Sequence, residues 1–211
     1  MGNRNLIITI EREYGSGGRT IGERLAQKLS IPYYDKNIIR MASEDSGIHE
    51  TLFGRVDEYT SAKPPLFGKT GIYKGELFPP QSKEFTSDEN LFNYQAKIIR
   101  ELAAKESCVI IGRCSNMVLN REDYPHVLRV FVHASWEFRL EEAAKKLNKS
   151  RREIEKFLQK DDKRKREYSL RFTGQEWTDK SNYDLYLDNS VLGYEGTIAE
   201  IEKHYLALKE K

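Results

Sequence analysis

The chain has 211 residues, 35 basic and 33 acidic side chains and a net charge of +2. This length fits one ordinary domain with a substantial core, and the charge balance argues against a nucleic-acid binder, which usually carries a clear basic excess. The sequence contains no apolar run of transmembrane length and no signal peptide, so no membrane contact is expected. Its two cysteines, Cys108 and Cys114, match no zinc spacing and favour a reduced, cytoplasmic protein.

A strand, a tight turn and a helix are predicted at the start of the chain. Residues 6–10 are an apolar run, glycines follow at positions 15, 17 and 18, and apolar residues then recur at helical spacing from Ile21 to Leu29. Glycine allows positive φ and close approach of a ligand to the backbone. The start of a helix presents unpaired N–H groups and the positive end of its dipole. Together these features favour a bound phosphate.

This turn, the glycine loop of residues 15–20, departs from the standard P-loop pattern G-x-x-x-x-G-K-[ST]. Aligned with the Gly-Lys-Gly-Thr variant of that pattern, Arg12 replaces the first glycine and Gly18 replaces the lysine. We expect Arg19 to supply the missing cation, because a guanidinium fork suits phosphate oxygens. The hydroxyl of Thr20 is placed to reach a magnesium ion. The alternative is a glycine turn that only starts a helix.

Strand and helix signals alternate along the rest of the chain. Further strands are expected at residues 31–34, 107–111, 128–132 and 184–188, with helices at 38–42, 91–103, 138–147 and 198–208. The run at 107–111 is almost continuously apolar, as in a strand buried on both faces of a parallel sheet. The alternation predicts an α/β fold in which a parallel sheet of about five strands is flanked by helices, in a single domain over residues 1–211.

Two segments stand apart from this alternation. Residues 51–90 have poor periodicity and contain four prolines, which predicts an inserted mobile segment. Ser150 and Glu153 form a capping-box pattern that starts a highly charged helix. Asp161, Arg164, Tyr168 and Arg171 share one face of that helix. We expect residues 150–180 to form a movable lid, the alternative being an ordinary solvated helix.

Polar residues follow the ends of the predicted strands. Ligands of parallel sheets bind beyond the carboxyl ends of the strands. The glycine loop, Asp35, Arg113 and Asp188 stand at four such ends. Arg113 directly follows a buried strand and a glycine, so it is a candidate for ligand binding. Its alternative role is that of a structural arginine at the start of a helix.

Four blocks of the sequence resemble a known family. They are ITIEREYGSGGRTIG, YYDKNIIR, CVIIGRCSN, and DDKRKREY followed by NYDLYLDNS. Together they resemble the cytidylate kinase-like group of the nucleoside monophosphate kinases. The resemblance implies a P-loop NTPase-type fold with an acceptor-side insertion and a helical lid. It also implies small-molecule nucleotide substrates, with ATP and Mg²⁺ used to transfer a phosphoryl group to a nucleoside monophosphate such as CMP or to a related small acceptor.

The same resemblance implies roles for individual residues. The donor phosphates would be cradled by Gly15, Ser16, Gly17, Gly18, Arg19 and Thr20, with Thr20 at the metal. The acceptor would be bound by Asp35, Arg40, Arg113 and Asp188. Catalysis would fall to Arg19, Arg113, Asp161 and Arg164, the last two on the lid.

The chain also departs from true cytidylate kinases. It has Cys114 in place of an aspartate, Lys36 in place of a serine and no lysine in the glycine loop, and the spacing from Asp35 to Arg40 is one residue shorter. These differences leave the acceptor open and leave a non-catalytic nucleotide-binding module as an alternative. A dinucleotide-binding oxidoreductase fits less well, because Thr20 stands where its third glycine would be and lid arginines have no role in hydride transfer.

Overall fold

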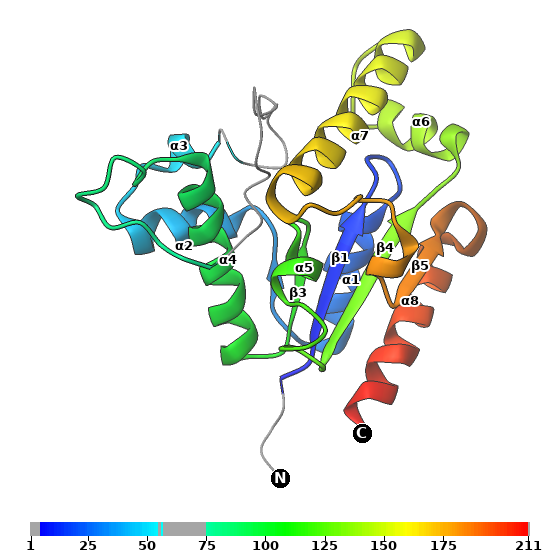
Figure 1. Ribbon diagram of the computed structural model, residues 1–211. Helices are drawn as coiled ribbons and strands as arrows, with labels where there is room; N and C mark the ends of the chain where they lie inside the picture. Colours follow the sequence, from blue (N-terminus) through cyan, green and yellow to red (C-terminus); the bar gives the residue numbers. More distant parts are fainter. Residues whose placement is uncertain (1–4, 55, 57–74, 211) are drawn as a thin grey trace.

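The computed structural model describes residues 5–54, 56 and 75–210. Its centre is a five-stranded sheet in the order β2-β3-β1-β4-β5, and every adjacent pair of strands is parallel (Figure 1). The strands are β1 (Ile7–Arg12), β2 (Tyr33–Tyr34), β3 (Cys108–Ile111), β4 (Val127–His133) and β5 (Leu185–Asp188). The α/β fold with a parallel sheet of about five strands that the sequence predicts is therefore confirmed.

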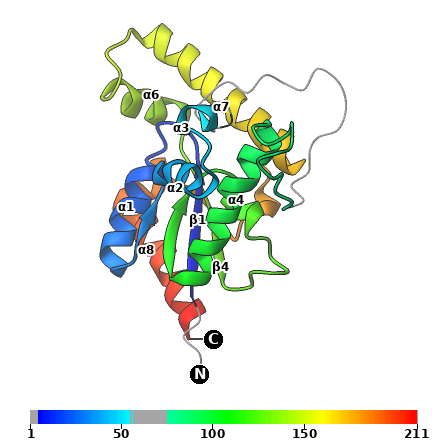
Figure 2. The same ribbon diagram turned by 90° about the vertical axis from the view of Figure 1, so that its left-hand side faces the viewer.

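Helices cover both faces of this sheet. They are α1 (Gly18–Leu29), α2 (Asn37–Ser46), α3 (Glu50–Phe53), α4 (Asp88–Lys105), α5 (Ser115–Val118), α6 (Trp136–Ala144), α7 (Arg151–Thr173) and α8 (Asn189–Lys209). Figure 2 shows α1 and α8 on one side of the sheet and α4 on the other. Helices α6 and α7 lie over the end of the sheet at which β1 and β4 finish (Figure 1).

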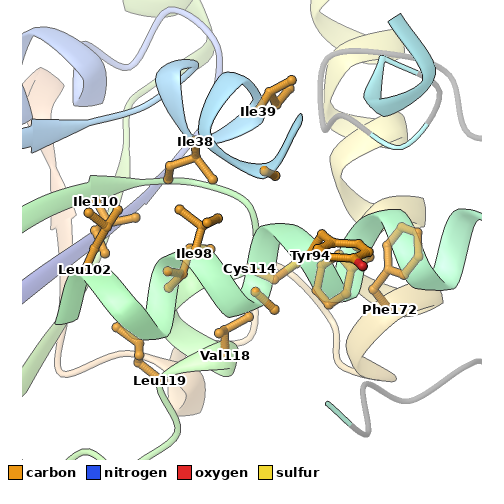
Figure 3. Close-up of a cluster of buried hydrophobic side chains, with 14 of the residues drawn as sticks. Ile38, Ile39, Tyr94, Ile98, Leu102, Ile110, Cys114, Val118, Leu119 and Phe172 are labelled. Atoms are coloured by element: carbon orange, nitrogen blue, oxygen red, sulfur yellow. The ribbon is translucent and has the colours of Figure 1, made fainter. Parts of the chain in front are cut away.

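The strand sequences explain why both faces are covered. Ile8 and Ile10 of β1 point into an apolar cluster with α1 and α8, whereas Ile7 points the other way. On that second face the cluster joins Ile110 of β3 to α2 and α4, as Figure 3 shows. Alternate residues of one strand therefore enter two different cores, which requires an apolar residue at nearly every position.

Several element boundaries differ from the sequence prediction. β1 continues through Glu11 and Arg12, which are only 3% and 4% exposed although both carry charge. β2 has only two residues, and α4 begins at Asp88 after Ser87 caps it by accepting a hydrogen bond from the N–H of Asn90. The capping box predicted at Ser150 is present at the start of α7.

The predicted insertion at residues 51–90 lies partly outside the described residues, at positions 55 and 57–74. Its described parts are α3 with residues 54 and 56 just after it, a stretch of loop and turns at 75–87, and the first turn of α4. Within the described part of the chain, no helix is both long enough and apolar enough to cross a membrane.

Candidate functional site

The glycine loop joins β1 to α1 in a conformation that requires glycine. Gly15 and Gly17 have φ values of 82° and 85°. A Cβ atom at Gly15 would lie 2.5 Å from the carbonyl oxygen of Arg139, and one at Gly17 would lie 2.8 Å from Nδ2 of Asn189. Gly17 is also the residue that caps α1. The backbone therefore turns tightly and delivers the unpaired N–H groups of the helix start to the loop.

Two buried side chains from other elements hold this loop in shape. Nε of Arg139 donates to the carbonyl oxygen of Tyr14 at 2.8 Å, and Nδ2 of Asn189 donates to that of Ser16 at 2.9 Å. Sequence reasoning missed both residues. Asn189 could have been noticed because it directly follows the last strand, but no local signal identifies Arg139.

A pocket of about 100 Å³ opens at the loop. This is well above the roughly 10–15 Å³ that one water molecule needs. Ser16 is buried, and its hydroxyl donates to the carbonyl oxygen of Glu13. The pocket is lined by Arg12, Glu13, Tyr14, Gly15, Gly17, Gly18, Arg19, Thr20, Glu142, Lys146 and Lys165. Five of the six residues predicted to cradle phosphate thus line one small pocket.

Asp35 brings two predicted arginines together. Its Oδ2 lies 2.7 Å from Nε of Arg19, and its Oδ1 lies 3.3 Å from Nη1 of Arg113. The side chain of Arg113 is fully buried and that of Asp35 is 10% exposed, whereas that of Arg19 is 45% exposed. Three predicted site residues therefore meet at the carboxyl ends of β2 and β3, next to the glycine loop.

The turn after β3 has a strained backbone. Gly112, Arg113 and Cys114 are three successive residues with left-handed φ values of 69°, 57° and 52°. Left-handed φ is uncommon for residues other than glycine, and such strain clusters at ligand sites. No sequence signal announces this turn beyond the glycine itself.

A cluster of charges on α7 faces the loop. Asp161 is buried, pairs with Arg164 and lies 3.1 Å from Nζ of Lys165 through its Oδ2. Lys165 also donates to the carbonyl oxygen of Arg12, the last residue of β1, at 2.9 Å. The predicted shared face of the helix is thus packed against the protein rather than solvated. Lys165, which is not among the residues predicted from the sequence, is the α7 residue that lines the pocket.

Two other predicted residues have different partners. The side chain of Arg40 is 67% exposed and pairs with Glu44 one turn further along α2. Asp188 caps α8, accepting hydrogen bonds from the backbone N–H and the hydroxyl of Ser190. Their acceptor-binding roles stay predictions.

Burial shifts the proton affinity of two loop residues. The pKa of Glu13 is raised by its burial, although the nearby Arg139 guanidinium and a hydrogen bond from the N–H of Ala134 oppose this rise. The pKa of Tyr14 is raised by burial and then by the Asp161 carboxylate. Both shifts favour the neutral form of the side chain, because burial penalises the charged form.

The described residues contain no group of three or more His, Cys, Asp or Glu side chains that could hold a metal ion by themselves. Magnesium does not need one, because it keeps several waters and is usually bound by one or two protein oxygens together with substrate phosphates. Thr20, on the wall of the pocket, fits such an arrangement.

A central parallel strand that runs into a glycine loop and then a helix is the arrangement found in P-loop folds. A family model described as the cytidylate kinase-like family matches residues 7–191. The chain therefore belongs to the cytidylate kinase-like family, which supports nucleotide or small-molecule kinase activity.

Solved structures agree with this fold. An uncharacterized protein from Eubacterium ventriosum ATCC 27560 is similar with a TM-score of 0.69 at 21% identity, covering 95% of this chain and 98% of that one. A shikimate kinase from Bacteroides thetaiotaomicron is similar with a TM-score of 0.52 at 15% identity, covering 98% of this chain and 99% of that one. None of the curated proteins searched matches the chain significantly.

Proposed function

We propose that this protein transfers a phosphoryl group from ATP to a small acceptor, either a nucleoside monophosphate such as CMP or a related molecule. The observation that carries the proposal is the glycine loop. Gly15 and Gly17 admit no side chain, and the pocket that they line with Thr20 lies at the start of α1. Backbone N–H groups and the helix dipole stabilise phosphate in such a position.

Exposed apolar side chains at the same edge of the sheet as the loop support a nucleotide over a bare phosphate. Trp136, Val191 and Leu192 are 37%, 79% and 43% exposed and follow the carboxyl ends of β4 and β5. The two segments are joined because the N–H of Ser135 donates to the hydroxyl of Ser190 at 3.0 Å. A flat apolar base would cover these side chains while its phosphates occupy the loop.

The acceptor side is assigned to Asp35 and Arg113. Phosphoryl transfer needs cations around the moving group, and little else is required of the protein. Arg19 lines the donor pocket and also pairs with Asp35, so it lies between the two sides. An acceptor phosphate would replace Asp35 as the partner of Arg113. Mg²⁺, when bound with ATP near Thr20, would neutralise charge on the transferred phosphate.

The test is an assay coupled to ADP release, with Mg-ATP and a panel of nucleoside monophosphates and small hydroxylated acids. We expect one acceptor to raise ADP release at least tenfold over acceptor-free hydrolysis. Arg113→Ala should then mainly raise the KM of that acceptor, whereas Arg164→Ala should mainly lower kcat. Arg121→Ala, at an exposed arginine near the opposite end of the sheet, is the control and should change neither. ADP release that no acceptor stimulates would contradict a kinase.

The alternative is a nucleotide-binding module without turnover. It is favoured by one feature of the site: Asp35 already neutralises two of the arginines that transfer would use. Calorimetry separates the two functions. Binding of ATP without phosphoryl transfer to any acceptor would support the module, and no binding of ATP, ADP or pyrophosphate would contradict both.

A further inference from the structure

The position at which P-loops carry their lysine is closed by this fold. A Cβ atom at Gly18 would lie 2.5 Å from Cβ and 3.0 Å from Cγ of Arg12, and 3.3 Å from Cβ of Val132. The Cβ atom of Arg12 belongs to the rigid base of a side chain on the central strand, so it cannot swing away. The two departures from the standard pattern are therefore linked. Arg12 replaces the first glycine, and its side chain occupies the space that any side chain at position 18 would need.

Arg19 does not simply take the place of that lysine. Its Nε lies 2.7 Å from Oδ2 of Asp35, so its charge is shared with the acceptor side of the site. The side chain is also 45% exposed, and solvent weakens the attraction of such a group for phosphate. Arg12 also lines the donor pocket at 4% exposure, and a second cation screened from water would add to it there.

Lys165 has that position. It lines the same pocket as Gly15, Gly17 and Thr20 but comes from α7, well over a hundred residues further along the chain. The residue is 4% exposed, and its Nζ lies 2.9 Å from the carbonyl oxygen of Arg12 and 3.1 Å from Oδ2 of Asp161. A lysine is rarely buried unless it is paired, and Asp161 provides the pairing here.

We propose that Lys165 binds the donor phosphates in place of the missing loop lysine, and that Asp161 positions its ammonium group. This inference rests on the proposed function and deepens it. An arriving phosphate oxygen is a stronger partner for the ammonium than the neutral carbonyl of Arg12, because charge-assisted hydrogen bonds are stronger. The cation thus reaches the loop from the helix packed over it, and α7 becomes part of the donor site.

The experiment compares a ligand that carries both base and phosphates with one that carries only the phosphates and one that carries only the base. Affinities for ATP, pyrophosphate and adenosine are measured by calorimetry for the wild type, Lys165→Met and Lys165→Gln. We expect Lys165→Met to weaken ATP and pyrophosphate binding on the order of 10- to 100-fold, the usual worth of a hydrogen bond to a charged group, and to leave adenosine unchanged. Lys163→Met is the matched control, because Lys163 is on the same helix with its side chain 76% exposed, and it should bind all three as the wild type does.

A second variant guards against misfolding. Lys165→Gln removes the charge but keeps N–H donors on a side chain one bond shorter, so it should fold even if Lys165→Met does not and should show the same loss for ATP. Asp161→Asn should weaken ATP binding in the wild type and add nothing in the Lys165→Met background, because it acts through the lysine.

The outcomes separate this inference from the proposed function. If the wild type binds ATP and a folded Lys165 variant binds it equally well, the inference is wrong and the kinase proposal stands. Equal losses for adenosine and ATP would assign Lys165 a structural role and overturn the inference as well. A wild type that binds neither ATP nor pyrophosphate would overturn both.

Discussion

Arg129 shows how one buried charge can organise several segments. It lies in β4 at 3% exposure, and its guanidinium lies 3.7 Å from Asp184. It donates hydrogen bonds to backbone carbonyl oxygens of four residues, which are Asn116, Leu119, Tyr124 and Val127. Burial lowers the pKa of Arg129, and the nearby Asp184 carboxylate partly offsets this shift. A charge in this position is tolerated because nearly every donor it has meets an acceptor.

Replacement of this arginine should be costly. Arg129→Met is expected to lower the free energy of unfolding by about 3 kcal/mol or more, because each buried carbonyl left without a donor costs roughly 1–3 kcal/mol. Arg121→Met is the control: its side chain contacts the same Asp184 but is 52% exposed, so the expected cost stays below about 1 kcal/mol. Urea unfolding measures both. Similar costs for the two variants would contradict the role assigned to Arg129.

Cys108 gives a second test, in the pH dependence of stability. Burial of this thiol in β3 raises its pKa to about 12. The thiol of the unfolded chain loses its proton at about pH 8.5, whereas the buried thiol of the folded protein keeps it. Stability therefore falls as the pH rises above that value. Between about pH 8.5 and 10, one such group should cost roughly 1–2 kcal/mol.

Cys108→Ala should flatten this fall. The variant is expected to be less stable than the wild type at pH 7.5, where it lacks the buried sulfur, and to approach the wild type at pH 10. Urea unfolding at the two pH values measures the change. A constant difference between variant and wild type would mean that another group controls the alkaline loss.

At the scale of elements, α7 joins two parts of the molecule. Ile154 and Leu158 in its first half pack with Leu140 and Ala143 of α6. In its second half, Phe172 stacks on Phe92 of α4 at 4.4 Å between ring centroids. A movement of the whole helix would separate those rings. We therefore expect any closure of the predicted lid, residues 150–180, to involve α6 and the first half of α7.

The ends of two helices make a matched pair for mutation. Ser30 ends α1 and Gly174 ends α7, both in left-handed conformation with φ values of 53° and 71°. Only glycine adopts that conformation without steric cost. Ser30→Gly should therefore stabilise the protein by about 0.5–1 kcal/mol, and Gly174→Ala should destabilise it by about 1 kcal/mol. Thermal unfolding tests this pair, and changes of the same sign would contradict it.

At the scale of the whole molecule, the sheet centre should be the most stable region. β1, β3 and β4 each pair with two neighbours, and Ile8, Ile110 and Val130 are fully buried. β2, in contrast, is a two-residue edge strand. Native-state hydrogen exchange should therefore show the amides of β1, β3 and β4 opening only with global unfolding, and those of β2 and residues 75–87 opening at lower free energy. Equal protection in the central strands and in 75–87 would contradict this ranking.

The sequence alone determined the features that depend on local physics. The glycine spacing located the glycine loop because positive φ is a property of single residues, and the capping box at Ser150 located the start of α7. The alternation of apolar runs and helical spacing gave the parallel sheet, since periods of two and 3.6 residues are set by the backbone. The glycine loop and the residues at the strand ends could therefore be predicted from the sequence alone.

Only the tertiary structure decided which of these residues meet. Arg113 reaches Asp35 across 78 positions, Arg139 reaches Tyr14 across 125, and Lys165 reaches Arg12 across 153. It also showed that Arg40 and Asp188 have other partners, because the first faces solvent on α2 and the second caps α8. Such contacts follow from how helices pack over the sheet, and that packing depends on the summed burial of many apolar side chains rather than on any local pattern. For the same reason, only the orientation of α7 above the loop shows that Lys165, and not its neighbour Arg164, lines the pocket.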